Sequence, residues 1–176
     1  MIETLVGYVL QFLDFFMPMT IVAEYEKAVL LRFGKYKRTL EPGLRWKIPF
    51  GVDDVLKDNV VPATRNLQPQ KLTTSDGVTV VVGAALRWSI RDIVKVKLHV
   101  EDSDSVLDDS TYGEIAGFVR ESTWDQINEV DWVQQVFAAV RKRAFRFGIE
   151  VEELWITDLA RTRVLCLVND TSGAML

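Results

Sequence analysis

The stretch AVLLRFGKYKRTLEPGLRWKIPF, residues 28–50, decides the fold because it combines an apolar run with regularly placed turn residues. β-Branched, aliphatic and aromatic side chains are frequent in residues 21–34, which predicts strands that end at Gly34. Glu41-Pro42-Gly43 signals a turn, since proline pre-sets φ and glycine tolerates positive φ. After this turn we expect the chain to run extended as far as Pro49.

Positive charge is concentrated on the same stretch, although the 176-residue chain carries a net charge of -4. Nucleic-acid-binding domains are usually basic, so no nucleic-acid partner is expected. Between residues 27 and 47 only Glu41 opposes seven cations. These cations either meet anionic lipid headgroups or belong to an ordinary solvated hairpin. We call them the basic surface: Lys27, Arg32, Lys35, Lys37, Arg38, Arg45 and Lys47.

An apolar segment, IETLVGYVLQFLDFFM (2–17), precedes the strands. Its polar or small residues recur every three or four positions, which predicts a helix with one narrow polar stripe. Such a helix is about 24 Å long, whereas a hydrocarbon core is about 30 Å thick. We therefore expect it to lie in the membrane interface without crossing, or else to pack against the protein's own core or a neighbouring subunit. The side chains expected to make the membrane or partner contact are Leu5, Val6, Val9, Leu10, Phe12, Leu13, Phe15, Phe16 and Met17.

The clearest strand pattern is VTVVVGAALRWSI, residues 78–90. Every even-numbered residue in it is apolar, whereas the odd-numbered ones include Thr79 and Arg87. This period of two predicts a strand with one buried face. A tight turn is expected before it at Ser75-Asp76-Gly77. Residues 52–72 should form a further extended region, interrupted by two prolines.

Two helices are expected to follow. The first covers 103–121, with a capping box at Thr111 and Glu114. The second is expected to be capped by Asp131, with Gln134 three residues on, and to end at Gly148. Its apolar face has helical spacing and consists of Val133, Val136, Phe137, Val140, Ala144 and Phe147.

Residues 149–159 are expected to form a closing strand. Several strands, two helices and one more strand predict an α+β domain. The last turns of the second helix carry four cations, which either complement the negative end of the helix dipole or contact an adjoining acidic subunit. These cations are Arg141, Lys142, Arg143 and Arg146.

Little in the sequence supports catalysis or metal binding. His99 and Cys166 are the single residues of their types, and we expect His99 to be an exposed strand residue. No phosphate-binding glycine loop and no GxSxG motif is present. The acidic run 101–109 fails the calcium-loop template, because Leu107 and Gly113 replace its Gly and Glu. We expect a solvated loop there that leads into a helix, and no catalytic, cofactor or metal site.

The order of these motifs resembles the stomatin–prohibitin–flotillin (SPFH, or Band 7) domain from about residue 21 to 160. The matching features are a basic turn, a Pro-Gly-Leu turn, a hairpin that opens on Asp-Gly-Val and a closing strand. In this sequence they are Arg32-Phe33-Gly34-Lys35, Pro42-Gly43-Leu44, Trp46-Lys47, Pro49, Gln70, Leu72-Thr73-Thr74, Asp76-Gly77-Val78, the strand 78–90 continuing through Asp92, and FGIEVEELWITDL at 147–159.

The resemblance implies an α+β fold with a mixed, mainly antiparallel sheet packed by two or more helices. It divides the chain into an N-terminal helix (1–20), the SPFH domain (21–160) and a short tail or helix (161–176). The implied function is a non-enzymatic scaffold that is peripheral or monotopic at a membrane and binds copies of itself, lipid and client proteins. An alternative is a structural subunit of a larger soluble assembly, with the N-terminal helix buried against a neighbour. The heptads of the family's long coiled coil are absent after residue 160, so a ring would close through the domain or the N-terminal helix.

Overall fold

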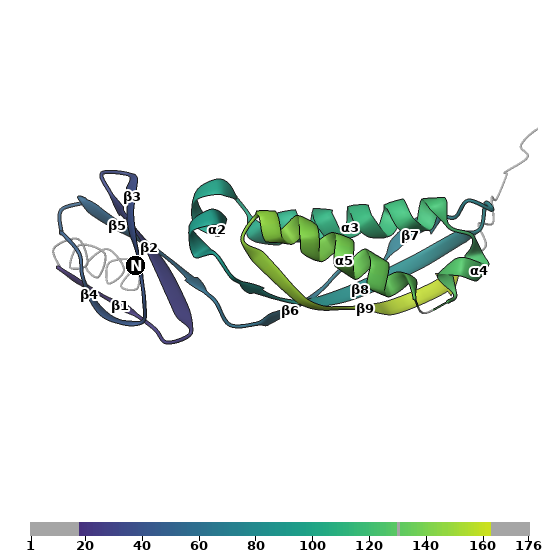
Figure 1. The fold of residues 1–176 in the computed structure, drawn as a ribbon, viewed down its shortest axis with the longest axis horizontal. Helices are drawn as coiled ribbons and strands as arrows, with labels where there is room; N and C mark the ends of the chain where they lie inside the picture. The colour runs from purple at the N-terminus through teal and green to yellow at the C-terminus, as the bar shows by residue number, and fades with distance from the viewer. Residues whose placement is uncertain (1–17, 130, 163–176) are drawn as a thin grey trace, which may run out of the picture.

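The computed structural model describes residues 18–129 and 131–162. Figure 1 shows an elongated arrangement with strands β1 to β5 at one end and helices over a long sheet at the other. We call residues 18–60 the N-terminal sheets and residues 63–162 the main body. The predicted N-terminal helix and Cys166 lie outside the described residues.

The N-terminal sheets consist of five short antiparallel strands. β1 (Met19–Val22) pairs with β4 (Gly43–Trp46). β2 (Glu26–Arg32) lies between β3 (Lys35–Leu40) and β5 (Asp53–Asn59). The chain was expected to run extended from the turn to Pro49, but it is a strand only as far as Trp46, where β4 ends.

Both predicted turns in this region are confirmed. The β2–β3 turn has positive φ at Phe33 (50°) and Gly34 (73°), as a two-residue hairpin turn requires. Gly43 opens β4 with φ of 114°, a conformation that a residue with a Cβ rarely adopts. A small buried cluster then fills the space between the sheets, made of Val22, Ala28, Leu30 and Leu40 with Val55 packed against it.

The main body is built around the long strand β8 (Thr79–Ile90). β8 pairs antiparallel with β6 (Ala63–Asn66), β7 (Gln70–Thr73) and β9 (Ile149–Arg161). The even-numbered residues of β8 enter the main core, as predicted, but the odd-numbered Gly83 and Ala85 are buried as well. The even-numbered residues that are fully buried are Val80, Val82, Ala84, Leu86 and Ile90.

Helices α3 (Ser103–Glu121) and α5 (Trp132–Arg146) cover one face of this sheet (Figure 1). The predicted apolar face of α5 is buried at Val136, Val140 and Ala144. The predicted end of α5 is also confirmed, because Gly148 has φ of 84° and its amide donates to the Phe145 carbonyl. β9 then starts directly and runs beneath the helices.

Two short helices were not predicted. α2 (Ile93–His99) begins at Asp92, whose carboxylate accepts from the amides of Val94 and Lys95. α4 (Trp124–Ile127) has a capping box, which was expected in α3 at Thr111 and Glu114. Thr123 is the N-cap residue of this box and Gln126 is its partner. The interpretation of His99 as a strand residue is wrong, because His99 ends α2.

The capping predictions for the two long helices need correction. Thr111 is buried inside α3, where its hydroxyl donates to the Leu107 carbonyl at 2.8 Å, so no helix starts there. Asp102 caps α3 instead, by accepting from the Asp104 amide. Asp131 does precede α5, but its side chain makes no capping hydrogen bond.

The predicted α+β class is confirmed. In the described residues, every strand pairing is antiparallel, and the strands form three sheets.

Candidate membrane and subunit contact surfaces

Two phenylalanines form an exposed tip on the N-terminal sheets. Phe33 lies in the β2–β3 turn and is 77% exposed, and Phe50 lies in the β4–β5 loop and is 60% exposed. The Phe33 amide donates to the Val52 carbonyl at 2.9 Å, so the turn and the loop adjoin. Both residues have positive φ, which costs roughly 1–3 kcal/mol for a residue with a Cβ. We call Phe33 and Phe50 the aromatic tip. Strain and exposure together make it a candidate contact site.

An ion pair holds the base of the aromatic tip. Arg32 Nε lies 2.7 Å from Asp53 Oδ1, and Arg32 Nη2 lies 3.0 Å from Asp53 Oδ2. The Asp53 side chain is only 1% exposed and also accepts from the Ile48 amide at 2.8 Å. The hydrogen bond from Arg32 is the main reason why the pKa of Asp53 is lowered, although burial opposes the shift. This pair joins β2, β5 and the loop that carries Phe50.

A row of exposed apolar side chains lies on β1 and β4. β1 and β4 pair in a register that sets Ile21 opposite Leu44 and Met19 opposite Trp46. These side chains share one face of the two-stranded sheet, because residues two apart in a strand point the same way. Ile21, Leu44 and Trp46 are exposed. A contiguous exposed apolar patch of this kind is typical of a site that binds a membrane or a protein.

Sequence reasoning missed the aromatic tip and this apolar row. Each phenylalanine precedes a glycine, Gly34 or Gly51, and this spacing was a usable signal for a strained turn. The exposure of the two rings could not be predicted from the sequence, because it depends on the tertiary structure.

The basic surface divides into cations that bind the chain itself and cations that remain exposed. Lys27 lies 3.7 Å from Glu41 in an ion pair. Arg45 donates to the carbonyls of Glu41 and Pro42 at 2.9 and 3.0 Å. Lys47, after β4, is half-buried, and its backbone amide donates to the Pro18 carbonyl. Exposed on β3, with no ion pair among the described residues, are Lys35, Lys37 and Arg38.

The four cations of α5 divide in the same way. Arg141 lies 3.4 Å from Glu150 of β9, and Arg143 pairs with Glu114 of α3. These two pairs tie α5 to its neighbours. Lys142 and Arg146 are exposed and have no ion pair within the part of the chain that the structure describes. The two predicted cationic sites lie apart, one on the N-terminal sheets and one on the main body.

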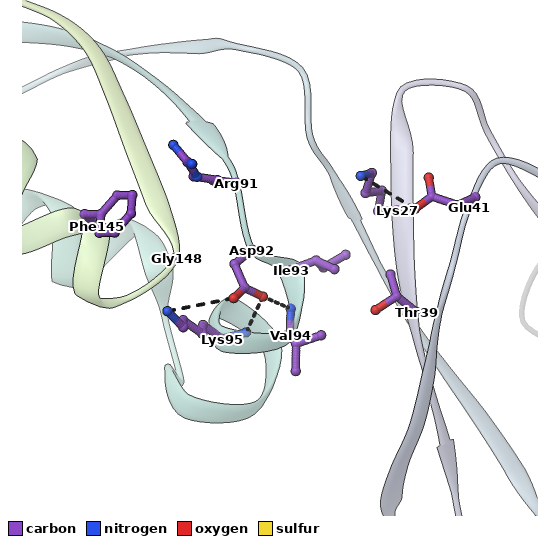
Figure 2. Close-up of a pocket in the computed structure, with 10 residues that line it drawn as sticks. All are labelled: Lys27, Thr39, Glu41, Arg91, Asp92, Ile93, Val94, Lys95, Phe145 and Gly148. Carbon is purple, nitrogen blue, oxygen red and sulfur yellow. Dashed lines mark hydrogen bonds and ion pairs between the residues drawn. The ribbon is translucent and has the colours of Figure 1, made fainter.

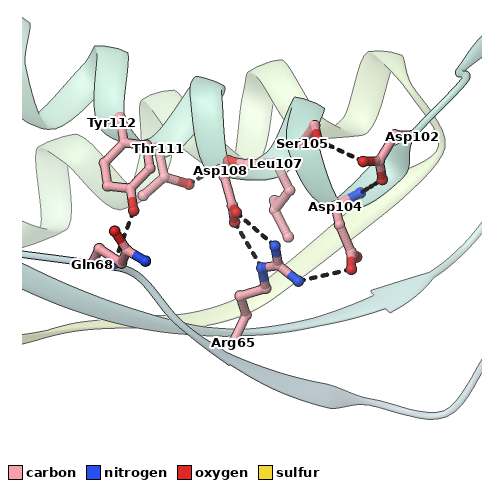
Figure 3. Close-up of polar contacts among 9 residues, drawn as sticks. All are labelled: Arg65, Gln68, Asp102, Asp104, Ser105, Leu107, Asp108, Thr111 and Tyr112. Carbon is pink, nitrogen blue, oxygen red and sulfur yellow. Dashed lines mark hydrogen bonds and ion pairs between the residues drawn. The ribbon is translucent and has the colours of Figure 1, made fainter.

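The acidic run 101–109 is a structural element (Figure 3). We expected a solvated loop that leads into a helix, but from Ser103 onward the run is the first part of α3, and two of its carboxylates form ion pairs. Arg65 of β6 donates to Asp108 at 2.9 and 2.7 Å and to Asp104 at 2.7 Å. The acidic run therefore holds α3 on the sheet.

A pocket of about 390 Å³ lies between the N-terminal sheets and the main body (Figure 2). Its charged groups are already engaged, since Lys27 pairs with Glu41 and Asp92 caps α2. Arg91 stacks over the Phe145 ring, 5.1 Å from its centroid. No histidine, cysteine or serine lines the pocket.

Among residues 18–129 and 131–162, no three metal-binding side chains gather into a site. In the same residues, no helix combines the length and the apolar character that a membrane span needs.

Comparison with known proteins gives a family match over most of the chain. The model of the SPFH domain / Band 7 family matches residues 20–161. Protein HflK of Vibrio cholerae is 34% identical over 114 residues, which cover 64% of this chain and 28% of that protein.

Two further relatives extend the comparison. The modulator of FtsH protease HflK of Escherichia coli K12 is 30% identical over 60% of this chain and 25% of its own length. Stomatin-4 of Caenorhabditis elegans is 27% identical over 84% of this chain and 53% of its own length. The chain thus spans about a quarter to a half of the length of these three relatives.

Proposed function

The chain belongs to the SPFH domain / Band 7 family, and we propose that it is a non-enzymatic scaffold at a membrane surface. In this proposal copies of the chain assemble side by side and organise or enclose client proteins. The proposed segments are a membrane-contacting helix (1–20), the SPFH domain (21–160) and a short tail (161–176).

One observation carries the membrane part of the proposal. The aromatic tip, the apolar row on β1 and β4 and the exposed cations of the basic surface all lie on the N-terminal sheets. Trp is enriched at membrane interfaces, and Phe and Leu are typical apolar side chains of interfacial segments. Each cation near anionic headgroups contributes about 1 kcal/mol. The chain leaves this end toward residue 17, so the predicted interfacial helix would meet the same surface.

The scaffold part rests on the absence of a reactive constellation among the described residues and on the relatives. No histidine, cysteine or serine lines the pocket between the two parts of the molecule. The name of the E. coli relative says that it modulates a protease, which supports a protein as the client of this chain. The proposed subunit contact includes the cations of α5, of which Lys142 and Arg146 are exposed.

Liposome flotation tests the membrane role. Full-length protein is mixed with vesicles of phosphatidylcholine containing 30% phosphatidylserine, and with vesicles of phosphatidylcholine alone. We expect flotation with both, and stronger flotation with the anionic vesicles. Removal of residues 1–17, which leaves β1 intact, should weaken binding at least tenfold. Unchanged flotation of the truncated protein would mean that residues 1–17 do not anchor it.

A detergent extraction, combined with particle sizing in the absence of lipid, separates the alternative role. If the full chain stays in the aqueous phase of a detergent extraction and forms large particles without lipid, it is a subunit of a soluble assembly. The N-terminal helix would then be buried against a neighbouring copy.

A further inference from the structure

We propose that the C-terminal end of α5 in one copy docks into the apolar groove beside β9 of a second copy. The proposal rests on the proposed self-association and names the two surfaces that would make it. We call the inserted surface the knob, formed by Lys142, Phe145 and Arg146. We call the receiving surface the groove, which lies between the first turns of α5 and the middle of β9.

The knob is an apolar ring flanked by two cations. Phe145 is 49% exposed, although Arg91 of the same chain lies over its ring, 5.1 Å from the centroid. Lys142 is three residues before Phe145 and four before Arg146, so it neighbours both of them on the surface of α5. Neither cation has an ion pair among the described residues. A knob of this kind fits a surface with an apolar floor and acidic edges.

The groove has that character. It measures about 470 Å³ and is lined by Val133 and Phe137 of α5 and by Leu154, Trp155 and Ile156 of β9. Its acidic edge is formed by Glu152 and Glu153. Aromatic rings buried in such pockets, with charges at the rim, are the usual energetic centres of protein interfaces.

The two carboxylates at the edge of the groove are weakly engaged. Glu152 accepts a hydrogen bond from the Ser89 hydroxyl at 3.0 Å and has no ion pair among the described residues. Glu153 and Arg87 are 3.6 Å apart, and both are exposed. An ion pair with that exposure contributes little. Both carboxylates are therefore available to cations from outside.

The open edge of β9 leaves the groove accessible. β9 pairs with β8 along one edge, and no strand of the described residues pairs with the other edge. The strand is 13 residues long and has two register shifts in its pairing. Natural proteins protect such edges with bulges and charges, and the acidic side chains of β9 do so here. A partner with cations can pair with these acidic side chains, whereas an acidic partner is repelled by them. The charges of β9 therefore select for a basic partner.

The occupant of the groove is a second copy, because the knob cannot reach the groove of its own chain. Phe137 and Phe145 are eight residues apart on one helix, which separates them by roughly 12 Å along its axis. Each copy therefore presents one knob and one unfilled groove. Contacts between unlike surfaces repeat from copy to copy and produce a ring, or a filament if the rotation does not close.

Charge reversal tests this pairing in full-length protein, by sedimentation velocity in micelles of a neutral detergent. Lys142→Glu/Arg146→Glu gives a copy with an acidic knob and an acidic groove. Glu152→Lys/Glu153→Lys gives a copy with a basic knob and a basic groove. We expect each variant alone to associate at least tenfold more weakly than the wild type. An equimolar mixture should regain association, because unlike copies can alternate.

A matched control carries the same charge change elsewhere. Lys71→Glu on β7 and Arg120→Glu on α3 alter two exposed cations far from both surfaces in sequence, and association should stay at the wild-type level. If either reversal variant associates like the wild type, or if the mixture does not recover, the knob and groove are not the interface.

The outcomes separate this inference from the proposed function. A wild-type chain that stays monomeric in micelles and on vesicles contradicts self-association itself. If the wild type and both charge-reversal variants associate equally, only the knob-and-groove contact is contradicted. Flotation of the two variants on anionic vesicles should match the wild type, which shows that they remain folded and membrane-competent.

Discussion

Arg32 and Asp53 join β2 to β5 through two hydrogen bonds, 2.7 and 3.0 Å long, directly behind the aromatic tip. The Asp53 carboxylate also accepts a hydrogen bond from the Ile48 amide, which fixes the start of the β4–β5 loop that carries Phe50. One ion pair thus positions both exposed phenylalanines.

Asp53→Asn should lower the urea midpoint at pH 7, because it leaves Arg32 without its charged partner. The pKa of Asp53 is lowered in the folded state, so its contribution is present above the unfolded pKa of about 3.9. It is lost as the pH falls further through the folded pKa. The gap between the wild-type and variant midpoints should therefore shrink below about pH 4. A gap that is constant from pH 7 to pH 3 would contradict this role.

Gly148→Ala should destabilise the main body. Gly148 has φ of 84°, and an added Cβ would lie 2.6 Å from the Asp92 carbonyl oxygen. Strain and overlap together should lower the free energy of unfolding by about 2 kcal/mol or more. The matched control is Gly117→Ala in α3, where a Cβ meets nothing within 4 Å. That change should stabilise the protein by about 0.5–1 kcal/mol, because alanine favours helix. Equal effects in chemical denaturation would refute the packing described for Gly148.

Leu86→Ala should remove about 2–5 kcal/mol from the free energy of unfolding, because Leu86 is fully buried under the helices. Leu98→Ala, at an exposed site on α2, should cost less than 1 kcal/mol. Urea unfolding followed by far-UV circular dichroism measures both. A small effect at Leu86 would mean that β8 is not the centre of the core.

Arg65→Gln should loosen α3 from the sheet. Arg65 is about one-third exposed, so losing its pairs with Asp104 and Asp108 should cost only about 1 kcal/mol. Salt screens such pairs, so the difference from the wild type should narrow between 0.05 and about 1 M NaCl. Thermal unfolding at several salt concentrations gives the result. A difference that grows with salt would exclude an electrostatic origin.

The elements that sequence alone could predict are those with long, regular patterns. The alternation in β8 and the apolar face of α5 depend only on local periodicity, and the glycines at 34, 43 and 148 mark turns through their positive φ. α2 and α4 have seven and four residues, too few to show a helical period. The Thr111–Glu114 pattern matched a capping box inside a helix, because that short motif also occurs by chance.

The site was harder to predict than the fold. Sequence indicated the cations, but not which of them are used internally, since Arg32–Asp53 and Arg65–Asp108 join residues 21 and 43 positions apart. The exposure of Phe33, Phe50 and Phe145 is likewise a property of the tertiary structure. A phenylalanine in sequence is ordinarily assigned to the core.

Hydrogen–deuterium exchange of the full chain, with and without vesicles containing 30% phosphatidylserine, tests most directly that the N-terminal sheets face the membrane. The account predicts slower exchange in peptides that cover the Phe33–Gly34 turn and residues 46–52, and unchanged exchange in α3. Replacing Phe33 and Phe50 by serine should abolish that protection at equal vesicle concentration. Two results would contradict a membrane-facing position of the N-terminal sheets. One is slower exchange only in the main body, and the other is unchanged exchange in the aromatic tip of vesicle-bound protein.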